Sequence, residues 1–199
     1  MPYCEVLALL QQGEESALSA LMKEFYNDLY NYAYKFAKDD ALVKDAIQEV
    51  FIDLWQRRHN ADKIVSIRFY LLKAIKNTVL KSIEKRKRFL GESDVEPAAF
   101  ESVFDVEKII IERQVSEEQA ARLRLLLEQL SARQREIIYL TFYQQLTAGE
   151  IALLMNINKQ SVYNLLHESL QKLRLYWKQQ PLNAGANAAC ALLAMMIAN

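Results

Sequence analysis

The sequence predicts an all-α fold of two small helical domains, joined by a flexible acidic linker, with a helix-turn-helix in the second domain. Through most of the 199 residues, apolar side chains recur at three- and four-residue spacing, which is the period of amphipathic helices. The chain holds only four glycines and three prolines, fewer than an all-β protein would need for its turns. A hydrophobic content of 52% is enough to build the cores of one or two domains.

Charge divides the chain into blocks that the net charge of zero conceals. The net charge is −6 over residues 1–56, +9 over 57–90, −7 over 91–118 and +4 over 119–199. Two cationic surfaces suited to phosphates therefore flank an anionic connector. The alternative is that these charged blocks are only solvent-exposed surfaces, which would explain a single block more easily than two separate basic blocks. We predict a first domain over 1–90, an extended acidic linker over 91–118, a second domain over 119–178 and a small apolar tail over 179–199.

The first domain opens with two amphipathic helices. One is expected over 14–38, and Asp39-Asp40 offers an N-cap for another over about 41–57. The polar side of the second helix carries acids and amides, which would repel DNA phosphates and suit a basic protein partner. That side consists of Asp45, Gln48, Glu49 and Asp53, opposite an apolar side of Ile47, Val50, Phe51, Leu54 and Trp55.

A basic stretch follows. Residues 57–66 interrupt the apolar period and are interpreted as a loop, and a helix resumes at Ser66. A long basic helix beside a basic, aromatic-flanked loop can follow a phosphate backbone and receive unstacked bases. The DNA-binding candidates are Arg58 and Lys63 in the loop and Lys73, Lys76, Asn77, Lys81 and Arg86 on the helix.

In the second domain, the stretch from Leu146 to Arg174 predicts two helices joined by a tight turn. Thr147 and Glu150 have the spacing of a capping box, and Asn156-Ile157-Asn158 is expected to end the first helix. In a helix-turn-helix the second helix enters the major groove, where Asn and Gln can pair with adenine. A plain helical hairpin would show the same pattern. The outward residues of the second helix are Gln160, Ser161, Tyr163, Asn164 and His167.

The sequence argues against an enzyme, a cofactor or a metal site. His59 and His167 lie in unrelated blocks, and no HExxH, CxxC, glycine-rich phosphate loop or nucleophile elbow occurs. Cys4 and Cys190 lie near opposite ends of the sequence, so we expect no disulfide framework and a reducing cytoplasm. No secretory signal is expected before residue 20, and the tail falls short of the roughly 20 apolar residues that span a bilayer.

Three blocks of sequence together resemble the bacterial sigma factors of the extracytoplasmic-function type, the two-domain members of the sigma-70 family. DAIQEVFIDLW is similar to the family's core-polymerase-binding helix, and FYLLKAIKN to its promoter-melting segment. LSARQREI and the later GEIA are similar to the domain that reads the minus-thirty-five promoter element. The resemblance covers roughly residues 14–90 and 120–176.

The resemblance implies roles for particular residues. Asp45, Gln48, Glu49, Phe51 and Leu54 would contact the coiled coil of the polymerase clamp. Asn77 would lie close to a flipped-out base of the minus-ten element, and the loop 58–64 would hold that base. Gln160, Ser161, Tyr163, Asn164 and His167 would lie on the minus-thirty-five reading helix. The implied partners are core RNA polymerase, promoter DNA and an anti-sigma factor that clamps the two domains, and the linker would pass through the polymerase channels.

The chain departs from the family at the reading helix and at the melting helix. Leu165 and Glu168 stand where many relatives have arginines, so we expect weak or unusual minus-thirty-five recognition. The aromatic residue before the melting helix's leucine is Tyr70, and its neighbour Phe69 could substitute in packing. Two other functions fit parts of the sequence: a stand-alone helix-turn-helix regulator that ignores polymerase, and an adaptor whose basic surfaces bind an acidic protein.

Overall fold

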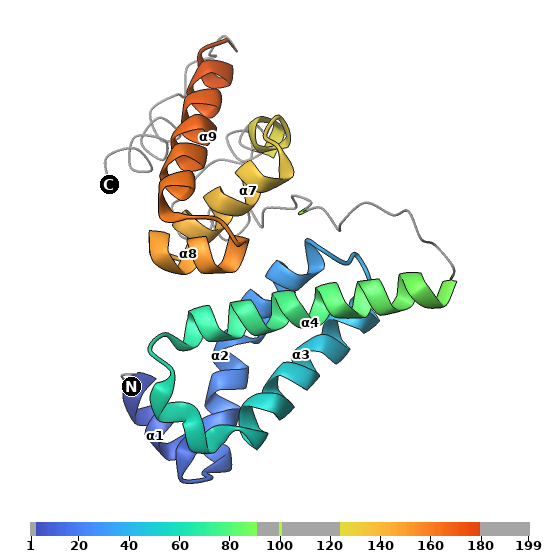
Figure 1. The fold of residues 1–199 in the computed structure, drawn as a ribbon, viewed down its shortest axis with the longest axis vertical. Coiled ribbons are helices and arrows are strands. Elements are labelled where there is room, and N and C mark those ends of the chain that lie inside the picture. Colours follow the sequence, from blue (N-terminus) through green and yellow to red (C-terminus); the bar gives the residue numbers. More distant parts are fainter. Residues whose placement is uncertain (1–2, 91–99, 101–123, 180–199) are drawn as a thin grey trace. The chain divides into compact units, whose positions relative to one another are not determined.

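In a computed structural model, the described residues are 3–90, Phe100 and 124–179, and these contain helices and turns without a strand (Figure 1). The chain divides into two compact units, Met1–Ala99 and Phe100–Asn199. The all-helical prediction is confirmed. The predicted linker, apart from Phe100, and the predicted tail beyond Gln179 lie outside the described residues. None of the described helices is long and apolar enough to cross a membrane.

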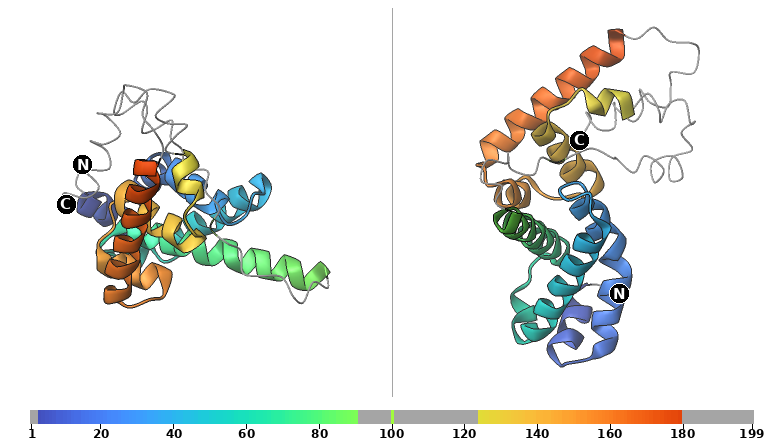
Figure 2. Two further views of the ribbon diagram at one scale, coloured as in Figure 1. Left: turned by 90° about the horizontal axis from the view of Figure 1, so that it is seen from above. Right: turned by 90° about the vertical axis from the view of Figure 1, so that its right-hand side faces the viewer.

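The first unit is a bundle of three long helices with two short ones at one end (Figures 1 and 2). Helices α2, α3 and α4 pack on one another, and the short α1 packs on the 3-10 helix η1. Neither short helix was predicted: no helix was expected before residue 14, and 57–66 was interpreted as a loop. In order, the elements are α1 (Tyr3–Gln11), α2 (Glu15–Tyr34), α3 (Asp40–Gln56), η1 (Arg58–Lys63) and α4 (Ile67–Leu90).

Large apolar side chains from all three long helices form the core of the first unit. Each of them is at most 2% exposed, and burying one such side chain is worth about 1.5–3 kcal/mol. An ion pair at the edge of this core joins α4 to α2: Arg68 Nη1 lies 2.7 Å from Asp28 Oδ2, and the guanidinium lies 5.2 Å from the centre of the Phe25 ring. The core includes Phe25, Leu29 and Tyr32 of α2, Ile47 and Leu54 of α3, and Leu71, Leu72 and Ile75 of α4.

Asp39 caps α3, as the sequence predicts, and also joins α3 to α4. Its Oδ1 accepts a hydrogen bond from the Leu42 backbone N–H at 3.1 Å, and its Oδ2 pairs with Arg86 Nη1. The bond from Leu42, followed by the bond from Arg86, lowers the pKa of the Asp39 carboxyl below its usual value of 3.8. The charged form is therefore the one that the folded state favours.

We predict that Asp39→Ala lowers the melting temperature of the protein at neutral pH. Because the folded pKa is depressed, the stabilisation is present in full above the usual value of 3.8 and disappears as the pH falls through the lower folded value. Thermal unfolding of wild type and variant between about pH 3 and about pH 7 should show a difference that shrinks toward the acid end. A difference that does not change with pH would contradict this, and Asp45→Ala serves as the exposed control.

The second unit is organised around α9 (Lys159–Gln179), which packs on α7 (Ala132–Ile138) and α8 (Ala148–Met155). Residues 124–128 are helical, and the π-helix η2 (Tyr139–Tyr143) continues α7. The core is again almost fully buried, which explains why these short helices are stable together. It includes Leu126, Ile137, Leu140, Ile151, Val162 and Leu173.

Capping side chains set where the helices of this unit begin. The predicted capping box of α8 is present: Glu150 N donates to Thr147 Oγ1 at 3.3 Å, and Thr147 N donates to Glu150 Oε2 at 2.8 Å. Ser131 and Gln134 form a second capping box at α7. Asn156 ends α8 in the left-handed conformation at φ 54°, as expected of a turn asparagine. The helix-turn-helix prediction is confirmed at Thr147, Glu150 and Asn156, whereas the capping box at Ser131 was not predicted.

Phe100 belongs to the second unit although it falls within the predicted linker. Its side chain is 2% exposed, and its ring centre lies 5.9 Å from that of Tyr139. Arg135 Nη2 donates a hydrogen bond to the Phe100 carbonyl at 3.4 Å. An apolar side chain in an otherwise acidic stretch gains by this burial, so this position is part of the packed unit and not of a free connector.

The left-handed turn gives a prediction for the second unit. Asn156→Ala should destabilise it by about 1 kcal/mol, because an alanine Cβ disfavours positive φ, whereas Asn156→Gly should be tolerated. Urea unfolding of the full chain, followed by a probe in the second unit, would measure both effects. Equal stability of the alanine and glycine variants would show that the turn is not strained.

Candidate polymerase and nucleic-acid interface

One exposed stripe on α3 combines polar side chains with an apolar one. Asp45, Gln48 and Glu49 are exposed, as predicted, and Gln48 and Glu49 lie one turn after Asp45 on the same face of the helix. Ile52 continues the stripe and is 48% exposed. An apolar side chain surrounded by polar ones is the usual composition of a protein interface. The sequence did not single out Ile52, because its spacing differs little from that of the buried positions.

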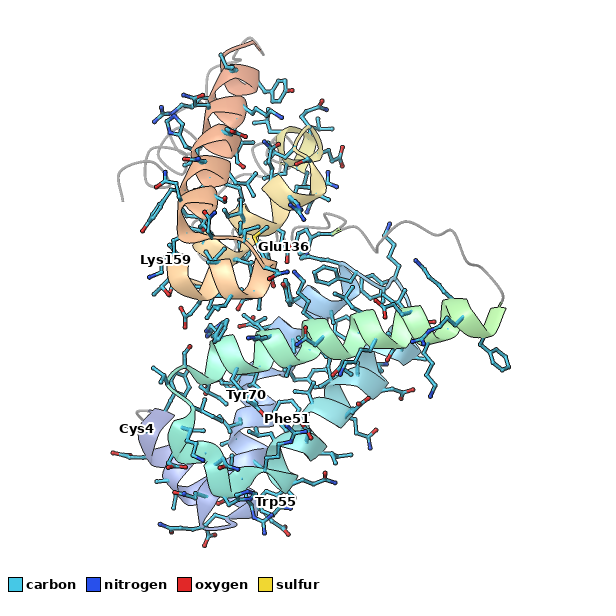
Figure 3. All side chains as sticks on the ribbon, in the orientation of Figure 1. Cys4, Phe51, Trp55, Tyr70, Glu136 and Lys159 are labelled. Atoms are coloured by element: carbon cyan, nitrogen blue, oxygen red, sulfur yellow. The ribbon has the colours of Figure 1, made fainter. Side chains whose placement is uncertain are left out.

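Two of the predicted polymerase contacts lie in the core instead. Phe51 is 2% exposed and Leu54 is 1% exposed, so neither can reach a partner docked on α3. In Figure 3 Phe51 lies among the helices of the first unit, and Trp55 lies near the end of α3. The side chains of Phe51 and Leu54 are on the apolar face of α3, which packs on α2 and α4. Their role is to hold the helix in place.

A row of cationic and amide side chains runs along α4. Lys73, Asn77, Lys81 and Lys85 are exposed at four-residue intervals, which places them on neighbouring turns of one face. The Lys73 ammonium lies 5.6 Å from the centre of the Phe69 ring. A row of this kind can follow a phosphate backbone, with Asn77 available to a base.

Two other predicted DNA contacts on α4 have contacts within the protein. Lys76 is half-buried, with its ammonium 5.3 Å from the centre of the Phe36 ring. Arg86 is exposed, but it pairs with Asp39. Their positive charge still adds to the potential of the helix, while their geometry is set by the partners inside the domain.

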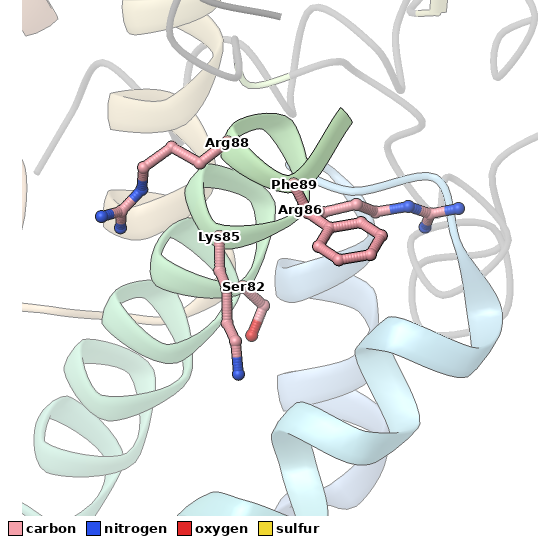
Figure 4. Close-up of a pocket in the computed structure, with 5 residues that line it drawn as sticks. All are labelled: Ser82, Lys85, Arg86, Arg88 and Phe89. Carbon is pink, nitrogen blue, oxygen red and sulfur yellow. The ribbon is translucent and has the colours of Figure 1, made fainter. Parts of the chain in front are cut away.

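The last turns of α4 border an open hollow (Figure 4). Its lining combines cations with an aromatic ring, since Phe89 is 91% exposed. Cations and a stacking surface are the two features that bind single-stranded nucleic acid. Phe89 was not among the predicted residues. The lining residues are Ser82, Lys85, Arg86, Arg88 and Phe89.

Arg58, predicted as a DNA contact, packs on α3. Its guanidinium lies 4.7 Å from the centre of the Trp55 ring, and its Nη1 donates to the Trp55 carbonyl at 3.0 Å. Lys63, the other predicted residue of this stretch, is exposed and donates to Asn60 Oδ1 at 2.7 Å. Val65, just after η1, is completely exposed. The exposed surface of η1 is therefore formed by residues that follow Arg58, and not by Arg58 itself.

Tyr70 and Phe69 both lie half-buried in the first turn of α4. Burial raises the pKa of the Tyr70 hydroxyl, and the negative charge of Asp53 raises it further. Tyr70 therefore remains neutral at physiological pH, which suits packing against other apolar groups. The Phe69 ring makes a cation–π contact with the ammonium of Lys73. The two aromatic residues thus make different contacts.

The exposed face of α9 presents the residues predicted for reading DNA. Gln160, Tyr163, Asn164 and His167 are exposed, and Ser161 is half-buried with its backbone N–H bonded to Asn158 Oδ1 at 2.7 Å. Gln160 Nε2 donates to Asn164 Oδ1 at 3.0 Å, and the side chains of Gln171 and His167 are 2.8 Å apart. The face is rich in amides but carries few cations near its N-terminal end.

The two departures on this helix differ in their surroundings. Leu165 is half-buried and Glu168 is exposed. A leucine that packs partly on the unit cannot be replaced by an arginine without exposing apolar neighbours, whereas the glutamate places a negative charge directly on the outer face. Among the described residues, no group of three or more acids, cysteines or histidines is arranged to hold a metal.

The sequence of the chain matches known protein families and individual relatives. Sigma-70 region 2 matches residues 21–89, and sigma-70 region 4 matches residues 120–173. The sigma factor SigX of Bacillus subtilis, of the extracytoplasmic-function type, is 26% identical over 164 residues, covering 80% of this chain and 83% of SigX. The sigma factor SigL of Mycobacterium tuberculosis, of the same type, is 25% identical over 170 residues, covering 82% of this chain and 92% of SigL.

A solved structure shares the fold. CnrH, in complex with the cytosolic domain of CnrY, aligns with a TM-score of 0.55 at 18% identity, over 88% of this chain and 97% of CnrH. The chain belongs to the sigma-70 family and, within it, to the sigma factors of the extracytoplasmic-function type. It is an RNA polymerase sigma factor that directs transcription initiation. Such a protein is not itself an enzyme, because catalysis belongs to the polymerase.

Because Lys81 is exposed and Arg58 is packed, we predict that truncating Lys81 affects DNA binding, whereas truncating Arg58 affects stability. Lys81→Ala should leave the melting temperature unchanged and reduce the slope of log K against log salt by about 0.7 for single-stranded DNA, the value for one phosphate contact. Arg58→Ala should destabilise the first unit by about 1 kcal/mol, because it loses a ring contact and a hydrogen bond. DNA titrations over a salt series, with thermal melts, distinguish the two. If Arg58→Ala instead reduced the salt dependence of DNA binding without lowering stability, the prediction that Arg58 contacts DNA would be correct.

Proposed function

We propose that the chain docks on core RNA polymerase through the exposed stripe of α3. Asp45, Gln48 and Glu49 supply negative charge and amide groups that fit a basic coiled coil, and Ile52 supplies apolar contact one turn further along the stripe. The observation that carries this proposal is the separation of charge within one unit. Exposed acids lie on α3, while exposed lysines follow α4, so a protein and a DNA strand can be bound at once.

We propose further that η1 and α4 hold the separated strands of the minus-ten region. The row Lys73, Asn77 and Lys81 would follow the phosphates, with Asn77 beside the flipped-out base. Lys63 and the exposed stretch after it would approach that base from η1. Phe89, at the far end of the helix, would offer a stacking surface to the same strand. Arg58 acts in this scheme by fixing η1 and not by touching DNA.

The second unit is proposed to read duplex DNA through Gln160, Tyr163, Asn164 and His167, with Ser161 near the backbone. The exposed amides suit adenine edges in the major groove. The exposed Glu168 and the packed Leu165 remove cationic contacts, so the minus-thirty-five contribution to affinity is small. Promoter choice then depends mainly on the first unit.

We also propose that an anti-sigma protein regulates the chain in the cytoplasm. CnrH, which has the same fold, was solved in complex with the cytosolic domain of CnrY. A partner that covered the acidic stripe of α3 would prevent docking on polymerase without unfolding either unit. The stripe is exposed in the described part of the chain and would be available to such a partner.

Binding to core polymerase in the absence of DNA tests the docking stripe. The double variant Asp45→Arg with Gln48→Ala should weaken binding at least about tenfold, because reversing one interface charge and removing an amide typically costs more than 1.4 kcal/mol. Ile52→Ala should weaken it less, through lost apolar contact. Fluorescence anisotropy of the labelled chain would give the dissociation constants.

Glu5→Arg is the matched control, since it reverses an exposed acid on α1 and should bind polymerase as wild type does. Each variant is then assayed for transcripts from supercoiled promoter DNA with core polymerase. Full activity of the Asp45 and Gln48 double variant would refute docking through α3. Absence of specific transcripts with the wild type would refute the proposed promoter function as a whole.

A further inference from the structure

The 3-10 helix η1 depends on support from outside itself. Its six residues, Arg58–Lys63, exceed the three or four that 3-10 helices usually reach, because the hydrogen-bond geometry of this helix is poor. Only Ala61 among them is buried. A segment with so little of its own core needs contacts from neighbours to keep one conformation.

One neighbour is α1, which packs directly on η1. Gln11, the last residue of α1, donates through Nε2 to the His59 carbonyl at 3.1 Å and lies 3.4 Å from Asp62 Oδ1. The two acceptors stand three residues apart and therefore lie on one side of η1. A single amide thus joins both halves of the 3-10 helix to α1.

The turn after α1 adds a second contact. Gly13 has φ +88°, and a Cβ at this position would lie 3.6 Å from Arg58 Nε. The backbone of the turn therefore passes beside the Arg58 guanidinium, which also stacks on the Trp55 ring of α3. Arg58 begins η1, so the start of the helix lies beside the turn and is bonded to α3 through Trp55, while Gln11 bonds to its middle and end.

We propose that α1 is a brace for η1, and that Gln11 is a positioning residue that determines how strictly the melted minus-ten base is recognised. The inference rests on the proposed role of η1 in holding that base. If η1 moves freely, its exposed residues meet a correct and an incorrect base with similar ease. If Gln11 fixes η1, only the correct base finds its contacts in place, and discrimination rises through preorganisation.

The experiment uses the full chain with core polymerase on a supercoiled promoter mapped from its transcripts. Four templates differ only in the melted minus-ten base. Abortive transcription on each template gives a discrimination ratio between the preferred base and the others. Gln11→Ala should lower this ratio about 3- to 10-fold, the range expected from the loss of one hydrogen bond, through slower initiation on the preferred base.

Three further variants separate positioning from a general loss of stability. Gln11→Lys keeps a donor that can reach both acceptors and should retain most of the ratio, whereas Gln11→Glu loses the donor, opposes Asp62 and should lower the ratio at least as much as alanine. Gln12→Ala removes the exposed amide next in sequence and should change nothing. Polymerase binding and melting temperature should be close to wild type in all of them.

Two results would overturn the inference. One is a wild-type discrimination ratio in Gln11→Ala, and the other is an equal loss of transcription on all four templates, which would indicate a structural role only. Both results require that the wild type initiates at the promoter, so they leave the proposed function of the chain intact. Failure of the wild type itself would instead refute that function.

Discussion

Burial of one apolar side from each of α2, α3 and α4 fixes what the first unit presents to its partners. Once Phe25, Ile47 and Leu72 are in the core, each helix has a single possible rotation about its axis. That rotation turns Asp45, Gln48 and Glu49 outward on α3 and Lys73, Asn77 and Lys81 outward on α4. Substitutions in the core would therefore impair polymerase docking and DNA binding together, although no core residue touches either partner.

Keeping opposite charges on different helices has a physical advantage. Acids beside the lysine row would weaken phosphate contacts, and lysines beside the acidic stripe would repel a basic partner. The exceptions are the exposed Glu84 on α4 and several ion pairs, such as Lys44 with Asp40 within α3 and, between elements, Arg68 with Asp28 and Arg86 with Asp39. In these pairs the charge is used within the unit, so the acid at Asp39 anchors α3 to α4 and does not oppose DNA.

The region proposed to hold the melted base is built from contacts between distant segments. Trp55 follows the docking stripe on α3, the turn at Gly13 follows α1, and both meet Arg58. The stacked pair of Arg58 and Trp55 thus joins the helix proposed to dock on polymerase to the segment proposed to hold the base. In the proposed scheme docking uses α3 and the base is held by η1, the element that follows α3 directly in the chain.

The sequence by itself determined the all-helical class, the approximate limits of α3, the caps at Asp39 and Thr147 and the turn at Asn156, whereas α2 ends at Tyr34 and not, as predicted, at residue 38. Periodicity and capping are local properties, so a single stretch of chain contains all the information that they need. The exposed members of the candidate sites, such as Asp45, Asn77 and Asn164, were predictable for the same reason.

The tertiary structure alone decided which matching residues face a partner. Phe51 and Leu54 share the motif of the docking helix but are used in the core, and Arg58 is cationic but stacks on Trp55. The same holds for α1, which is stable only because it packs on η1 and α2, and for Phe100, which is buried by contact with Tyr139. Burial depends on residues far away in the sequence, and therefore no local pattern can specify it.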